Sequence, residues 1–101
     1  MSRPEFVTNE DIARWSENID NDPKLPVTLS SNPVIREVCY AGLWLCEELE
    51  KLGCPEELIT RIQFTAGRAA YGRDPWEVHQ ELLNGYKNNE LEYEVDPETL
   101  N

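Results

Sequence analysis

The residues best suited to catalysis are one histidine and three cysteines in a chain of 101 residues. Cys54 stands where a helix is expected to begin, and the partial positive charge there favours a reactive thiolate. A thiolate paired with a histidine could act as a nucleophile. His79, however, falls on the apolar side of the last expected helix, and no feature of the sequence brings it near Cys54. We therefore expect no enzyme, and a thiol-dependent enzyme stays as the second alternative function.

Metal binding is not expected from the spacing of the candidate ligands. Cys39 and Cys46 would lie about 10.5 Å apart along one helix, whereas the ligands of a single tetrahedral ion lie close together. Residues 18–22 place oxygen-bearing side chains at the first three ligand positions of a calcium loop. Pro23 then stands where that loop needs glycine, and Leu29 where it needs a bidentate glutamate. Neither a metal nor a cofactor is therefore expected.

The overall composition favours a single small domain in the cytoplasm. Nine basic and twenty acidic residues give a net charge of −11, which disfavours contact with nucleic-acid phosphates. There is no apolar run of membrane-spanning length and no signal peptide, so no membrane association is expected. An odd number of cysteines fits reduced thiols better than a disulfide framework, and cytoplasmic localisation is the expectation.

Residues 33–52 form the longest apolar-periodic segment and predict the central helix. Asn32 suits the N-cap because its side-chain oxygen can accept from an unpaired first-turn N–H. Pro33 suits the first helical position, and Gly53 suits the left-handed residue that ends a helix. The apolar side of this helix spans a broad arc, which predicts contact with more than one neighbour.

Three further helices are predicted, so the expected fold class is mainly α: a small bundle of three main helices with a short N-terminal one. A capping box at Thr8 and Asp11 begins the short helix, and a proline marks the start of each of the other two. The three predicted ranges are 9–18, 55–71 and 75–87. Together with a loose arm over residues 1–6, they make residues 1–101 one helical domain.

Two short segments alternate apolar and polar residues in the way that is typical of strands. Residues 25–29 and residues 91–95 could form a minor two-stranded β pair, which is stable only when it packs on helices. A disordered tail over the acidic C-terminal segment 88–101 explains the second pattern equally well. The sequence leaves these two alternatives open.

An arginine–aromatic stripe on the predicted helix 55–71 is the clearest candidate binding site. Helical spacing places four residues on one side of that helix, opposite its apolar face: Arg61, Phe64, Arg68 and Tyr71. Aromatic side chains and arginine are enriched at the centres of protein interfaces. The competing interpretation is that the N-terminal helix or the acidic tail covers the stripe, with Glu92 or Glu94 paired to an arginine.

Tyr40 and Trp44 form a second candidate binding surface, on the charged outer side of the central helix. Arg36 and Lys51 flank them. The short helix that carries Trp15 could cover this surface, because three tryptophans in a small domain can cluster. The same short segments cannot easily cover both surfaces, so we expect at least one of them to be partly exposed.

The predicted function is a non-catalytic protein-interaction module that binds a protein partner, or itself, through the arginine–aromatic face. The acidic surface would assist the approach of a basic partner, and direct nucleic-acid binding is not expected. The main alternative is an acidic inhibitor that blocks a nucleic-acid-binding enzyme, as anti-restriction, anti-CRISPR or immunity proteins do. That alternative requires one cluster of carboxylates, drawn from Glu47, Glu48, Glu50, Glu90, Glu92 and Glu94.

Overall fold

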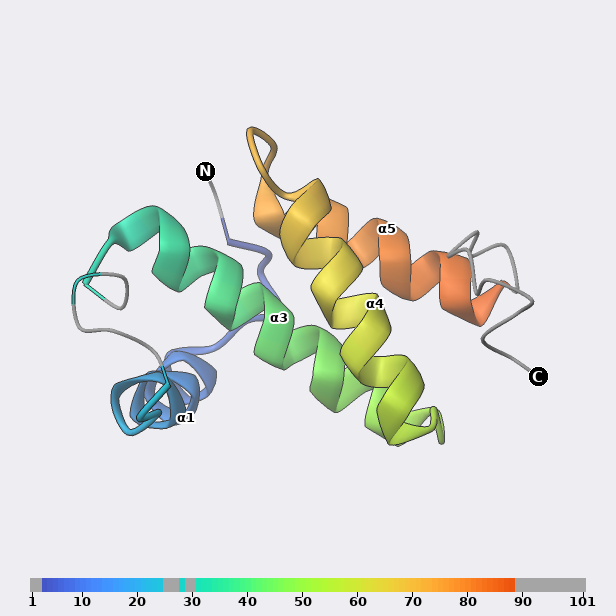
Figure 1. Ribbon diagram of the computed structural model, residues 1–101, viewed down its shortest axis with the longest axis horizontal. Helices are drawn as coiled ribbons and strands as arrows, with labels where there is room; N and C mark the ends of the chain where they lie inside the picture. Colours follow the sequence, from blue (N-terminus) through green and yellow to red (C-terminus); the bar gives the residue numbers. More distant parts are fainter. Residues whose placement is uncertain (1–2, 25–27, 29–30, 89–101) are drawn as a thin grey trace.

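The computed structural model describes residues 3–24, residue 28 and residues 31–88, and it is mainly helical (Figure 1). Four helices follow one another along the chain: α1 (Asn9–Asp20), α3 (Pro33–Lys51), α4 (Glu56–Ala69) and α5 (Pro75–Lys87). The predicted mainly α fold class is therefore confirmed, and the described residues contain no strand. The predicted β pair falls on residues 25–29 and 91–95, which, apart from Thr28, lie outside the described residues.

Three of the helices begin where a side-chain oxygen binds a free backbone N–H group. Thr8 Oγ1 accepts from the Asp11 N–H and Asp11 Oδ2 accepts from the Thr8 N–H, both at 3.1 Å, which completes the predicted capping box. Asn32 and Asp74 cap α3 and α5, and each is followed by a proline at the first helical position. Because one such cap contributes about 1 kcal/mol, these residues fix where each helix starts.

Glycine forms the turns that separate the three main helices. Gly53 and Gly72 both have a φ of 78°, a left-handed conformation that residues with a Cβ rarely adopt. The helix α4 ends at Ala69 rather than at residue 71, because residues 70–73 already form the turn towards α5. The helix α1 continues to Asp20 rather than ending at residue 18.

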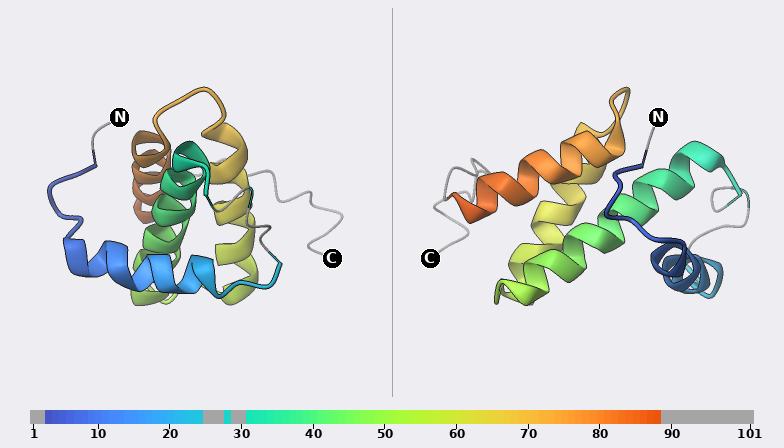
Figure 2. Two further views of the ribbon diagram at one scale, coloured as in Figure 1. Left: turned by 90° about the vertical axis from the view of Figure 1, so that its left-hand side faces the viewer. Right: turned by 180° about the vertical axis from the view of Figure 1, so that it is seen from behind.

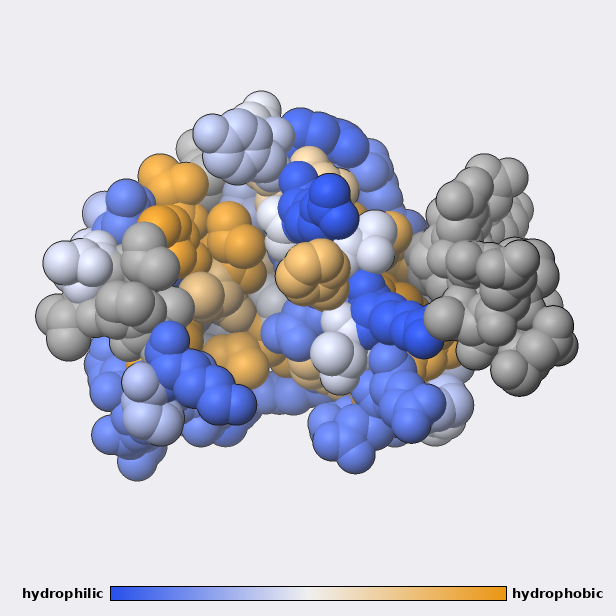
Figure 3. All heavy atoms as spheres, in the orientation of Figure 1, coloured by the Kyte–Doolittle hydropathy of each residue, from blue (hydrophilic) through white to orange (hydrophobic). Residues whose placement is uncertain are grey.

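The helix α3 is central, because it packs against each of the other three helices. The helices α4 and α5 lie on one side of it, and α1 crosses it on the side away from α4 (Figures 1 and 2). From the turn at residues 52–55 that joins them, α3 and α4 diverge, so the N-terminal part of α3 and the C-terminal part of α4 are well separated (Figure 1). Hydrophobic residues gather over that part of α3, beside the hydrophilic side chains of α4 (Figure 3).

The core contains all three tryptophans of the chain, which gather around Trp76 of α5. The ring centroids of Trp15 and Trp44 each lie 6.1 Å from that of Trp76. Trp15 and Trp76 are both only 1% exposed. Since each aromatic side chain buries about 150–250 Å² of surface, this cluster joins α1, α3 and α5 through one continuous apolar contact.

Each of the two buried indole N–H groups donates to a carboxylate of α3. Trp15 Nε1 donates to Glu47 Oε2 and Trp76 Nε1 donates to Glu37 Oε2, both at 2.8 Å. A buried N–H without an acceptor would cost about 1–3 kcal/mol. The charged side of α3 therefore supplies the acceptors that allow the indoles of two neighbouring helices to be buried.

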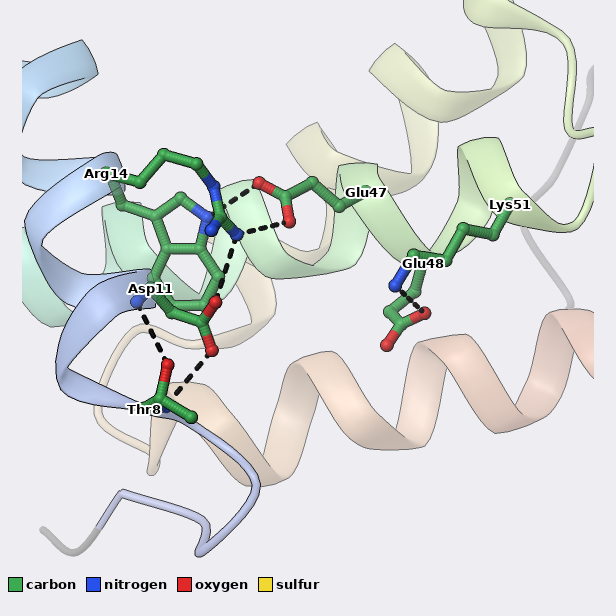
Figure 4. A network of polar contacts seen from close by, with 7 residues as sticks. Thr8, Asp11, Arg14, Glu47, Glu48 and Lys51 are labelled. Carbon is green, nitrogen blue, oxygen red and sulfur yellow. Dashed lines mark hydrogen bonds and ion pairs between the residues drawn. The ribbon is translucent and has the colours of Figure 1, made fainter.

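Each of these carboxylates also binds an arginine from the N-terminal part of the chain. Arg14 donates to Glu47 at 2.8 Å and also contacts Asp11 (Figure 4). Arg3 Nε donates to Glu37 at 2.8 Å. The arginines compensate the charge of two carboxylates that the packing of α1 and the N-terminal arm removes in part from water.

Tyr40 and Trp44 are buried, so the prediction that they stand on an outer face of the central helix is wrong. They are only 5% and 9% exposed. The ring centroid of Trp15 lies 6.4 Å from that of Tyr40, and Phe6 stacks on Trp44 at 5.3 Å. The helix carrying Trp15 and residues of the arm predicted to be loose thus cover the second candidate surface.

Replacing Glu37 should show how far the burial of Trp76 depends on its acceptor. We expect Glu37→Leu to lower the free energy of unfolding by about 1–3 kcal/mol, because the indole N–H then lies buried without a partner. Glu37→Gln, which keeps a carbonyl oxygen as an acceptor, should cost less. Urea denaturation followed by tryptophan fluorescence measures both variants.

The matched control for that experiment is Glu50→Leu, a change of the same kind on an exposed part of α3. Its effect should stay within about 0.5 kcal/mol. Equal destabilisation by Glu37→Leu and Glu37→Gln would contradict the assigned role of the indole–carboxylate bond.

Candidate functional site

The arginine–aromatic stripe lies on the exposed side of α4. Phe64 is 66% exposed and Tyr71, just beyond the helix, is 94% exposed. Arg61 and Arg68 are exposed as well. The guanidinium carbon of Arg68 lies 5.8 Å from the ring centroid of Phe64, one helical turn away. The structure therefore brings all four predicted residues to one surface, with Phe64 and Arg68 already in contact.

The helix α1 does not cover this stripe. It crosses α3 on the side away from α4 (Figure 2). Its Trp15 is buried there, next to Tyr40 of α3. The proposed covering by Glu92 or Glu94 concerns residues outside the described part of the chain. Within residues 3–24 and 31–88, α4 packs against α3 and α5 only, which leaves its arginine–aromatic side in contact with solvent.

Arg61 and Arg68 differ from the other arginines of the chain. Neither forms an ion pair with any carboxylate in the described residues, whereas carboxylates bind Arg3, Arg14, Arg36 and Arg73. The acidic residues of α4 lie only in its first turn, at Glu56 and Glu57. The exposed side of α4 is therefore a cationic area on a chain of net charge −11.

A groove of about 850 Å³ separates this side of α4 from α3. Its volume falls in the range of about 300–1,000 Å³ that binding clefts occupy. Most of its lining is apolar or uncharged, and Arg68 is the charged residue among the lining residues. The lining residues are Val38, Cys39, Gly42, Thr60, Gln63, Phe64, Gly67, Arg68, Tyr71 and His79.

His79, the lining residue supplied by α5, is 1% exposed. Its Nδ1–H donates to the carbonyl oxygen of Pro75 at 2.6 Å, so Nε2 is an acceptor. That Nε2 is buried and has no hydrogen-bond partner in the described residues. Burial lowers the pKa of His79, which therefore stays neutral at pH 7.

The three thiols are held in their unreactive protonated form or out of contact with solvent. Burial raises the pKa of Cys39, and it raises the pKa of Cys46 to about 11, with Glu50 and Glu47 acting in the same direction. Cys54 is buried, and its Sγ lies 3.7 Å from the carbonyl oxygen of Pro55. None of these thiols is hydrogen-bonded to His79.

Other kinds of site receive no support from the described part of the chain. Its histidine, cysteine and acidic residues form no group of three or more that could hold a metal ion. None of its helices is long and apolar enough to cross a membrane.

Sequence reasoning found the outer side of α4 but missed the opposite wall and the floor of the groove. Glycine at positions 42 and 67 was the available signal, because glycine inside a helix marks either close approach or missing side-chain volume. A Cβ on Gly42 would lie 3.2 Å from Gln63 Nε2, so this glycine serves the contact between α3 and α4. A Cβ on Gly67 would meet nothing within 4 Å, so this glycine leaves space.

Comparison of the chain with family models, curated proteins and solved structures finds no match. The groove and the stripe beside it must therefore be interpreted from their own geometry.

Acidification should test the environment of His79. Because burial lowers its pKa in the folded chain, the unfolded chain binds the proton more readily, and the fold should lose stability as the pH falls below about 6.5. The loss cannot exceed about 1.4 kcal/mol per pH unit for one group. We expect His79→Leu to lose less stability than the wild type between pH 7 and pH 5.5, as measured by urea denaturation.

An NMR titration of the wild-type imidazole gives an independent check of this histidine. Its resonances should show a midpoint below pH 6.5. A midpoint above that value would contradict the assigned burial, whether or not the His79→Leu variant folds.

Alkylation should distinguish the thiols of the folded chain from free cysteine. A rise in the pKa of Cys46 from 9.0 to about 11 lowers its thiolate fraction roughly 100-fold at neutral pH. We expect iodoacetamide to label Cys46 much more slowly in the folded chain than in urea, with each site followed by peptide mass spectrometry. The urea-denatured chain is the control, and equal rates in the two conditions would show that this thiol is not protected.

Proposed function

We propose that this protein is a non-catalytic interaction module that binds a protein partner through the stripe on α4 and the adjoining groove. The observation that carries the proposal is the exposure of Phe64 and Tyr71 at 66% and 94%, beside two exposed arginines that form no ion pair within the described residues. The tryptophans and Tyr40 are buried, whereas these two rings are the most exposed of the large hydrophobic side chains in the described residues. A partner would cover them.

Covering these rings would supply part of the free energy of binding. Complete burial of an aromatic side chain contributes about 1.5–3 kcal/mol, and the Arg68 guanidinium packs over the Phe64 ring. Side chains that are ordered before binding lose less entropy when the complex forms. Phe64 and Arg68 are therefore the expected centre of the interface.

Long-range charge and local charge have different roles in this proposal. A net charge of −11 favours approach of a protein that is basic overall. Screening limits that attraction to about 10 Å at ordinary ionic strength, so the local charge of the groove decides the contact itself. The arginines of α4 make that contact area cationic.

The acidic-inhibitor alternative has less support from the described residues. It requires a cluster of free carboxylates, yet Glu47 binds Trp15 and Arg14, and Glu48 forms an ion pair with Lys51 (Figure 4). Of the other carboxylates invoked for it, Glu50 is exposed on α3, and those at positions 90, 92 and 94 lie outside the described residues. A thiol-dependent enzyme is also disfavoured, because burial makes the cysteine thiols less reactive and none of them is hydrogen-bonded to His79.

A double variant of the stripe tests the proposed function. Phe64→Ala with Arg68→Ala should weaken binding of the partner by roughly 30-fold or more, since truncation of even one central residue costs about 2 kcal/mol. The partner is captured from the source cell, identified by mass spectrometry and titrated against the purified variants. Sedimentation velocity on the same samples detects binding of the chain to itself.

The control variant, Lys51→Ala with Leu52→Ala, removes one cation and one exposed apolar side chain from a different surface. Both double variants should keep the helix content of the wild type, because the replaced side chains are exposed. Loss of helix in the stripe variant would mean that these residues belong to the core. The proposal would be overturned if the wild type and both double variants captured the partner equally and showed the same distribution of masses in sedimentation velocity.

A further inference from the structure

We propose that the groove between α3 and α4 binds an amphipathic helix of a partner protein, and that this helix carries carboxylates beside its apolar side. The inference rests on the proposed function and names the chemistry of the partner. Three independent features lead to it: the dimensions of the groove, the space at Gly67 and two arginines without an ion pair in the described residues.

The dimensions of the groove suit a helix of two to three turns. Its α4 wall extends from Thr60 to Arg68, which corresponds to roughly 12 Å along a helix axis at about 1.5 Å per residue, and Tyr71 continues the wall in the turn after α4. The opposite wall is the N-terminal part of α3, and the two helices diverge towards the open end (Figure 1). Two helices with an apolar groove between them form the arrangement into which amphipathic helices dock in other proteins.

Gly67 gives this wall room for a neighbouring helix. It lies inside α4 and lines the groove, and a Cβ added there would meet no atom within 4 Å. Glycine inside a helix costs about 1 kcal/mol relative to alanine, and the packing of the described residues gives no reason for it. A helix that approaches α4 closely at this point would use the space that the glycine leaves.

The cations of α4 decide which polar residues the occupant should carry. Arg68 lines the groove, and Arg61 lies on the same exposed side of α4. Both point to an acidic neighbour, because neither forms an ion pair in the described residues. Carboxylates flanking the apolar side of a docked helix would bind them with charge-assisted hydrogen bonds. A basic helix would instead place like charges together.

A second copy of the chain fits the groove less well. Packing two α4 stripes against each other about a twofold axis would bring the arginines of one chain to those of the other. Two chains of net charge −11 also repel each other. The acidic segment 89–101 of the same chain follows α5, which ends on the side of α4 away from the open end of the groove (Figure 1).

The experiment is a selection from a displayed library of helical peptides with randomised surface positions. Binding to the wild-type chain is selected, and binders that also bind Gly67→Leu are removed, because a leucine at position 67 fills the groove. Ala69→Leu is the matched control: it makes a similar change on an exposed position of α4 that does not line the groove. Both changes should preserve the fold, since leucine is a good helix former.

The expected result is a set of peptides with apolar residues at helical spacing and glutamate or aspartate beside them. Their affinity should be unchanged by Ala69→Leu and should fall at least 10-fold with Arg61→Gln and Arg68→Gln combined. If the peptides that bind the wild type but not Gly67→Leu are basic or uncharged, the proposal of an acidic partner helix is wrong. The proposed function would remain intact. A selection that yields no groove-dependent peptide at all, with circular dichroism showing folded variants, would overturn the groove itself as the binding site.

The same experiment also tests the two alternative occupants of the groove, which are the acidic segment of the same chain and a second copy of the chain. A variant with Glu90, Glu92 and Glu94 changed to glutamine should bind the selected peptides with the wild-type affinity. Binding that becomes more than 10-fold tighter would identify the chain's own acidic segment as the occupant and overturn the proposal. If sedimentation velocity detects a dimer that the selected peptide dissociates, a second copy of the chain is the occupant of the groove. That result would also overturn the proposal.

Discussion

The packing of this protein depends on hydrogen bonds between buried indoles and the carboxylates of its central helix. Trp15 and Trp76 come from different helices, yet each donates its N–H to a glutamate of α3 at 2.8 Å. Without those acceptors, burying two indoles would leave two polar groups unpaired in the core. Glu37 and Glu47 thereby turn a charged side of α3 into a second packing surface, and α1 can be part of the fold only because that surface exists.

The arrangement of the helices divides the aromatic residues into two groups with different surroundings. Those near α3 are covered from the N-terminal side of the chain, where Phe6 and Trp15 close over Trp44 and Tyr40. The aromatics of α4 face the other way. Because α1 is short and is already engaged on α3, it has no remaining length with which to cover α4. The exposure of the α4 side therefore follows from where α1 binds.

Local signals were enough to predict the helices of this fold, and longer-range contacts explain what was missed. Caps such as Asn32 and terminators such as Gly53 act within a few residues, so the sequence shows them directly. Tyr40 and Trp44 were misplaced because helical periodicity treats a charged neighbour as a sign of solvent, whereas Glu47 accepts from a distant indole. The stripe at Phe64 was found because its residues are close in the sequence and follow helical spacing. Its groove was not, since α3 and α5 contribute the other walls.

Gly67 shows how this protein balances its stability against an open surface. Most positions of a small helical domain are free to accumulate residues that favour the helix, and substitution by alanine is the simplest such gain. No contact among the described residues requires a glycine at this position. In stable proteins the residue types mostly agree with the local structure, and departures from that agreement concentrate at functional sites. The helix stability given up at this point in α4 is the counterpart of the open space that the glycine leaves beside the groove.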